Sequence, residues 1–251
     1  MKKIFFLLLS LVIFPCQVAF ANVNVNIITS DGITERDITN TARAIQYTGS
    51  YMYSHFQRQL HSNITLSLVK ADNDLPKNDS GSFSTQGNIT VAIKNSENDY
   101  RTIFLVAHEL IHQYQLDIVT PDTLNKNLWF TEGMADYFAM KIANMTGQDR
   151  TKSFLKYALQ SCNYDISLKD ITTRDGWTFY SKTMNPYIIA DSAILQITSK
   201  HSDETLFGYL LTLQTHTADE AMRLIYGINM TQASSCSLIE KADAISKRRL
   251  F

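Results

Sequence analysis

Two histidines and a glutamate stand at a spacing that can build a catalytic metal site. The segment from His108 to His112 reads H-E-L-I-H, so the two histidines are four residues apart. On a helix, residues four apart lie on one face, and both imidazoles can reach one metal ion. Imidazole nitrogens suit Zn²⁺, and Glu109 could take a proton from a water on the open side of that ion. The pattern therefore predicts hydrolysis by a metal-activated water.

A catalytic zinc usually has three protein ligands, so a third side chain is needed. The segment W-F-T-E-G-M-A-D-Y, residues 129–137, offers Glu132 as this ligand. Asp136 follows four residues later on the same helical face, where it could accept the other ring N–H of a ligand histidine. Gly133 would let a facing helix or the metal approach closely. The sequence thus predicts a site assembled from two separate segments.

The H-E-L-I-H motif needs a helix, and the sequence around it predicts one. Apolar residues recur at helical spacing from about Asp99 to Leu116. The preceding sequence predicts a strand over 23–28, a helix over 35–60 capped by Thr34 and Asp37, a strand over 64–69, a loop over 71–84 and a strand over 89–93. From Leu128 onward almost all of the sequence has a helical pattern.

This order of elements predicts an α+β protein with one catalytic domain, residues 22–251. Its N-terminal lobe, 22–116, should hold a small mixed β-sheet and the active-site helix. Its C-terminal lobe, 117–251, should be mainly helical. No repeat or flexible linker suggests a second independent domain.

The first twenty-one residues have the pattern of a secretory signal peptide. Two lysines precede an apolar run over residues 4–14, and Ala-Phe-Ala at 19–21 supplies a small-x-small cleavage site. We expect cleavage after Ala21, a secreted or periplasmic protein, and no membrane span after that cleavage.

The composition is that of a folded protein and gives no sign of nucleic-acid binding. The chain has 23 Lys+Arg against 24 Asp+Glu, so it lacks the basic excess that nucleic acid requires. After signal cleavage Cys162 and Cys236 remain. They could pair in an oxidising compartment or stay as two separate thiols.

The combined motifs resemble the gluzincin metallopeptidases, zinc enzymes whose third ligand is a glutamate. Nineteen residues separate His112 from Glu132, as in thermolysin-like enzymes. The sequence W-F-T-E-G-M-A-D-Y is more similar to the W-x-x-E-G-x-A-E/D motif of the M1 aminopeptidases and bacterial peptidase MA-like domains. The resemblance implies a zincin-like fold and a zinc ion held by His108, His112 and Glu132. It also implies Glu109 as general base and Asp136 beside the ligands.

Gluzincins also need a donor that stabilises the oxyanion of the tetrahedral intermediate. The segment N-P-Y-I-I-A, residues 185–190, resembles the P-Y-x-x-G/A pattern that carries this tyrosine in M1-like enzymes. The resemblance implies Tyr187 for this role, although a tyrosine there could also be a core residue. Tyr180 and His201 are the alternative donors.

One family motif is absent. The M1 aminopeptidases carry a G-x-M-x-N motif with an acidic residue that binds the free amine of the substrate, whereas residues 84–91 read S-T-Q-G-N-I-T-V here. This strand could still bind an extended peptide through its backbone. We therefore expect an endopeptidase rather than an aminopeptidase.

Together these features predict a zinc metallopeptidase acting on peptide or protein substrates. One alternative is a catalytically inactive, zinc-stabilised binding module of peptidase fold. Another is a metallohydrolase that acts on non-peptide amides or esters. The intact Glu109 favours an enzyme, because a structural zinc site needs no general base.

Overall fold

The computed structural model describes residues 25–60, 63–71, 83–85, 87–94, 98–160, 164 and 166–230. The predicted signal peptide and both Cys162 and Cys236 lie outside these residues. The described residues form two compact units. One contains the described residues up to Asp117 together with Ile142–Gln148, and the other contains Ile118–Lys141 and the described residues from Asp149 onward.

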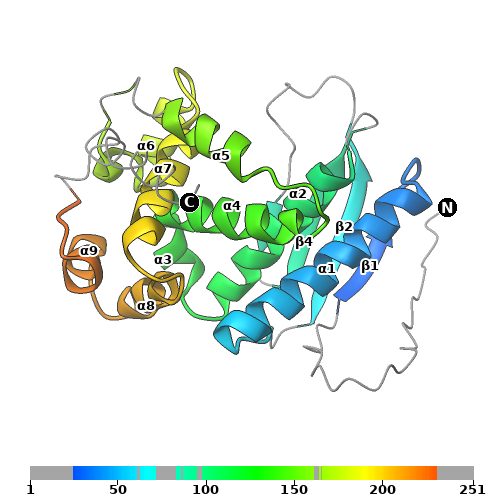
Figure 1. Cartoon of the computed structure of the whole chain (residues 1–251), viewed down its shortest axis with the longest axis horizontal. Coiled ribbons are helices and arrows are strands. Elements are labelled where there is room, and N and C mark those ends of the chain that lie inside the picture. The colour runs from blue at the N-terminus through cyan, green and yellow to red at the C-terminus, as the bar shows by residue number, and fades with distance from the viewer. Residues whose placement is uncertain are drawn as a thin grey trace, which may run out of the picture. The chain divides into compact units, whose positions relative to one another are not determined.

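The first unit combines a small sheet with two long helices (Figure 1). The strand order is β1-β2-β4-β3, with β1 (Val25–Thr29), β2 (Ile64–Lys70) and β4 (Asn88–Ile93) parallel and β3 (Phe83–Thr85) antiparallel. Helix α1 (Glu35–Phe56) connects β1 to β2, and helix α2 (Asp99–Leu116) follows β4. The two helices pack against each other, and α2 also contacts β3 and β4. The predicted mixed sheet and the predicted helix from Asp99 to Leu116 are confirmed.

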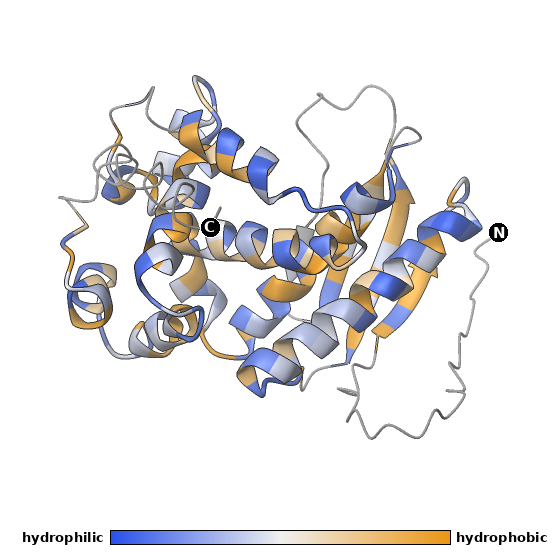
Figure 2. Ribbon diagram, in the orientation of Figure 1, coloured by the Kyte–Doolittle hydropathy of each residue, from blue (hydrophilic) through white to orange (hydrophobic). Residues whose placement is uncertain are grey.

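The core of this unit follows from alternation along the strands and from the burial of α2. Ile64, Leu66 and Leu68 alternate along β2 and are almost fully buried. Figure 2 shows the strands mainly in hydrophobic colours, whereas α1 carries hydrophilic and neutral colours toward the viewer. Helix α2 is buried around most of its circumference. Polar side chains in its middle are therefore held in a rigid, largely dry environment.

Two boundaries differ from the prediction. Helix α1 has the predicted cap, in which Thr34 and Asp37 bond to each other's backbone N–H, but it ends at Phe56. It ends there because Gln57 is left-handed, with φ of 54°. Leu60 is buried outside the helix, and its apolar character extended the predicted pattern to residue 60. Strand β3 (Phe83–Thr85) overlaps the end of the segment predicted as a loop, 71–84, and its three residues are too few to give a strand pattern.

The second unit is helical in its described part, as predicted. It contains α3 (Pro121–Asn125), most of α4 (Leu128–Asn144), α5 (Thr151–Ala158), the 3-10 helix η2 (Leu168–Ile171), α6 (Arg174–Tyr180), α7 (Pro186–Lys200), α8 (Glu204–Thr212) and α9 (Ala218–Tyr226). Helices α4 and α7 approach closely at Gly133, where an added Cβ would lie 2.7 Å from the carbonyl oxygen of Ala190. The rings of Phe130 and Tyr209 lie 4.3 Å apart in the core. None of the helices in the described part of the chain has the length and apolar character needed to cross a membrane.

Candidate metal centre

Helix α2 brings together two predicted metal ligands and the predicted general base. The Nε2 atoms of His108 and His112 lie 3.0 Å apart. The Oε1 atom of Glu109 lies 3.9 Å from Nε2 of His108. Ligand atoms of all three side chains fall within 4.8 Å of one another, which is the arrangement predicted from H-E-L-I-H.

The spacing of the two nitrogens fits a zinc ion. Two nitrogens bound tetrahedrally to one zinc at about 2.0–2.1 Å would lie about 3.3 Å apart. The observed 3.0 Å is close to this value, so a small side-chain movement would suffice. The two rings are nearly perpendicular, at 83°, so they meet edge to face and are not stacked. His108 and His112 therefore fit a shared metal ion.

Burial makes a positive charge at this site favourable. Glu109 is only 3% exposed and His108 only 7% exposed. A carboxylate with so little access to water is costly unless a cation or hydrogen-bond donors compensate it. Among the described residues, the ionic partner of Glu109 is His108, which is charged only when protonated. A metal cation between the histidines would supply the compensating charge.

Gln115 belongs to the site although the sequence analysis did not identify it. Its Oε1 atom lies 2.8 Å from Nδ1 of His112, and the residue is fully buried. An amide oxygen can only accept, so the contact places a proton on Nδ1 and leaves the Nε2 lone pair for a metal. Its position three residues after His112 on one helix is a signal that could have identified it.

Gln113 fixes the β3–β4 turn to helix α2. Its Oε1 accepts a hydrogen bond of 2.9 Å from the backbone N–H of Gly87. Its Nε2 donates one of 2.9 Å to the carbonyl oxygen of Thr85. Strand β3 is therefore held close to α2. No sequence signal distinguished this buried glutamine from a solvated one.

Glu132 and Asp136 lie in the second unit, on helix α4 as predicted. They are four residues apart and share one face of the helix. Both are half-buried, whereas the residues between them are buried. This face is thus the more accessible one in this part of α4. Their roles toward the two histidines stay predictions.

Tyr187 is the second residue of α7 and lies in its first turn. The side chain of Asn185 caps this helix by accepting a hydrogen bond of 3.1 Å from the Tyr187 N–H. The Tyr187 ring packs nearly perpendicular to Trp177 at 5.0 Å and is half-buried. Tyr180, an alternative donor, lies on α6 with its ring 5.1 Å from Phe179. The oxyanion role stays a prediction.

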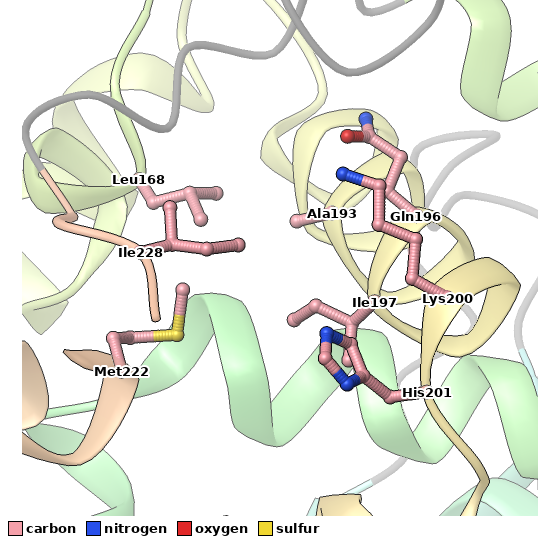
Figure 3. A pocket seen from close by; sticks show the side chains of 8 residues that line it. All are labelled: Leu168, Ala193, Gln196, Ile197, Lys200, His201, Met222 and Ile228. Carbon is pink, nitrogen blue, oxygen red and sulfur yellow. The ribbon is translucent and has the colours of Figure 1, made fainter. Parts of the chain in front are cut away.

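His201, the other alternative donor, lines a small cavity in the second unit (Figure 3). Leu168, Met222 and Ile228 face the side chains of Ile197, Lys200 and His201 across it. Among the described residues, His201 is the only predicted site residue that lines this cavity. The cavity measures only about 10 Å³, which is room for about one water molecule and too little for a substrate.

An α+β unit with H-E-L-I-H on a buried helix is the arrangement expected of a zincin-like peptidase domain, and two comparisons found similar proteins. Residues 78–184 match the model of the Peptidase family M1 domain. The chain is similar to the crystal structure of an aminopeptidase N family protein from Idiomarina loihiensis. The TM-score is 0.61, the identity is 15%, and the match covers 87% of this chain and 44% of that chain.

A second similar structure is a two-domain M1 zinc metallopeptidase mutant bound to L-arginine. Its TM-score is 0.49 and its identity 17%, over 81% of this chain and 45% of that chain. The chain therefore spans less than half the length of both structures. No curated protein gives a significant sequence match.

The family match and the first structure confirm two predictions, the resemblance to gluzincin peptidases and the α+β fold, which resembles that of M1 peptidase domains. They also agree with the predicted class of enzyme, a zinc metallopeptidase. The matched segment contains His108, Glu109, His112 and Glu132.

Proposed function

We propose that this protein is a zinc-dependent peptidase that hydrolyses peptide bonds with a metal-activated water. The observation that carries the proposal is the convergence of the His108 and His112 Nε2 atoms, 3.0 Å apart, beside the buried Glu109 carboxylate. The match of residues 78–184 to the M1 peptidase domain supports it.

The metal would be held by His108, His112 and Glu132. Gln115 orients His112 through the bond to Nδ1, and Asp136 would accept a ring N–H from a ligand histidine. Bound zinc would polarise the scissile carbonyl and lower the pKa of its water ligand to near neutral.

Glu109 performs the proton transfer in this proposal. Its carboxylate accepts a proton from the attacking water and delivers it to the nitrogen of the leaving amine. Burial keeps other water from competing for that carboxylate. Tyr187 would donate a hydrogen bond to the oxyanion.

The substrate would be an extended peptide bound at the edge of the sheet. Strand β3 is the outermost strand next to β4, and no described strand pairs with its outer side. A peptide can add to such an edge through backbone hydrogen bonds. Gln113 holds this edge against α2, which would place the peptide near the metal. Because residues 84–91 lack G-x-M-x-N, we propose internal cleavage over removal of N-terminal residues.

We also propose that residues 1–21 are a signal peptide and that the mature protein is secreted or periplasmic. Mass spectrometry of the exported protein should find Asn22 at the N-terminus. An N-terminus at Met1 would contradict this proposal.

A mixed peptide library tests the substrate class. Zinc-loaded wild-type protein and Glu109→Ala would each be incubated with peptides of which half are blocked at the N-terminus. We expect wild type, and not the variant, to cut blocked peptides internally. Cuts confined to unblocked peptides would identify an aminopeptidase instead. A zinc-loaded, folded wild type that cuts no peptide would contradict the proposal and favour the inactive binding module.

A further inference from the structure

Trp177 packs against the ring of Tyr187 within the second unit. The two ring centroids lie 5.0 Å apart and the ring planes meet at 84°, which is the edge-to-face arrangement that aromatic pairs favour. Trp177 belongs to α6 and is only 7% exposed, whereas Tyr187 is half-buried at the start of α7. The buried indole is therefore in a position to hold the more accessible phenol.

Helix α7 itself does little to fix the direction of the Tyr187 side chain. Inside a helix the preceding turn restricts the first side-chain torsion, but Tyr187 is the second residue of α7, so no turn of that helix precedes it. Its backbone is held, because Asn185 accepts a hydrogen bond of 3.1 Å from the Tyr187 N–H and donates one of 2.7 Å to the Tyr157 hydroxyl. The direction of the ring is therefore set by packing.

Trp177 is itself held firmly in α6. The carbonyl oxygen of Thr173 accepts a hydrogen bond of 2.9 Å from the Trp177 N–H, and the Thr173 hydroxyl accepts one from the N–H of Gly176. An added Cβ at Gly176 would lie 2.0 Å from the carbonyl oxygen of Asp170, so this turn packs directly against η2. A ring anchored in this way limits the movement of the ring beside it.

We propose that Trp177 is a positioning residue for the Tyr187 hydroxyl. The indole excludes side-chain rotamers of Tyr187 that would turn the phenol away, so the donor is oriented before the oxyanion forms. Such a donor stabilises the charge of the transition state without having to be ordered at that moment. The inference rests on the proposed oxyanion role of Tyr187 and names the residue that maintains it.

Kinetics on the N-blocked peptide that wild type cuts fastest test this role. Trp177→Leu and Trp177→Met both remove the ring but fill its space differently. Each should lower kcat about three- to tenfold, which matches the strength of one aromatic pair, and should leave KM nearly unchanged because the oxyanion exists only in the transition state. Trp177→Phe keeps an aromatic partner and should retain most of kcat. Phe179→Leu, an exposed aromatic change on the same helix, should leave kcat unchanged.

A double-substitution cycle separates positioning from a general structural effect. Tyr187→Phe removes the hydroxyl and should lower kcat by about 10²-fold or more. In that background Trp177→Leu should lower kcat no further, because it acts through the hydroxyl. An equal loss in both backgrounds would overturn the positioning role and leave the peptidase proposal intact. Wild-type kcat for Tyr187→Phe would overturn the oxyanion role, and the positioning role with it.

Fluorine NMR tests the ring contact without turnover. A fluorotyrosine introduced at Tyr187 alone should give a resonance displaced from that of the unfolded protein, because the indole lies beside it. Trp177→Leu should reduce this displacement, whereas Phe179→Leu should not. A resonance that Trp177→Leu leaves in place would overturn the proposal, even for a protein that cuts no peptide.

Discussion

The side-chain oxygen of Gln115 lies 2.8 Å from Nδ1 of His112, and this contact determines which nitrogen of the histidine turns toward His108. Both residues belong to the same buried helix, so the orientation is built into α2 before any metal binds. The two histidines of the proposed metal site are therefore already oriented within the first unit.

Gln115→Leu should weaken zinc binding by about 10- to 100-fold, because His112 loses the acceptor that fixes its tautomer. Competition with a chromophoric chelator would measure the affinity. Gln115→Glu keeps an acceptor at this position and should retain the wild-type affinity or exceed it. Equal affinity for wild type and Gln115→Leu would show that the contact does not support the metal.

Metal removal should destabilise the wild-type protein. A ligand that binds only the folded state at 100 times its Kd stabilises it by about 2.7 kcal/mol. Thermal unfolding with excess zinc and after chelation should therefore give a higher Tm with zinc for wild type. His112→Ala should show no such difference, since it lacks a ligand. A zinc-dependent Tm that survives His112→Ala would contradict the assignment.

Gly133→Ala should destabilise the protein by about 1–3 kcal/mol. The added Cβ would lie 2.7 Å from the Ala190 carbonyl oxygen and 2.9 Å from Ile194 Cγ1, so α4 and α7 must separate. Gly208→Ala, on α8, is the matched control, because no described atom beyond its chain neighbours and the backbone of its own helix lies within 4 Å of the added Cβ. That change should stabilise by about 0.5–1 kcal/mol through helix propensity. Denaturant unfolding of both variants would measure the difference, and equal effects would refute the proposed close contact.

Asp99 should make the stability of the first unit depend on acid pH. Its carboxylate accepts hydrogen bonds from Arg36 at 2.6 Å and Asn40 at 2.7 Å, and these bonds lower its pKa in the folded state. The stabilisation is therefore present above the unfolded pKa of about 3.9 and is lost as the pH falls through the lower folded pKa. The effect should be modest, because the ion pair is exposed.

Unfolding of wild type and Asp99→Asn between pH 7 and pH 2.5 would test this. The stability difference should be largest near neutral pH and shrink in acid. Asp31→Asn, at an exposed turn, controls for the loss of one negative charge. A difference that grows toward acid pH would contradict the assigned direction of the pKa shift.

Local patterns predicted the elements of the first unit, and they failed where a tertiary contact decides the structure. Helix α2 has the predicted bounds because its capping and apolar spacing are local. Helix α1 ends at the left-handed Gln57. Glycine is the usual residue at such a helix end, so a glutamine there does not predict the end. Strand β3 is held by backbone pairing to β4 and by Gln113, and neither contact leaves a pattern in three residues.

The candidate site shows the same division. The spacing of H-E-L-I-H predicted the convergence of His108, Glu109 and His112, because four residues on a helix fix the geometry. Gln115 stands at a helical spacing from His112, but that spacing does not show that the glutamine is buried beside the ring, so it was missed.

The central claim is that Glu109 acts as the general base of a zinc peptidase, and one paired measurement tests it most directly. Zinc content and peptide cleavage would be measured on the same preparations of wild type and Glu109→Ala. We predict equal zinc content, with cleavage by the variant lower by about 10²- to 10⁴-fold. Cleavage by Glu109→Ala near the wild-type rate, or wild-type cleavage by protein that contains no zinc, would contradict the account.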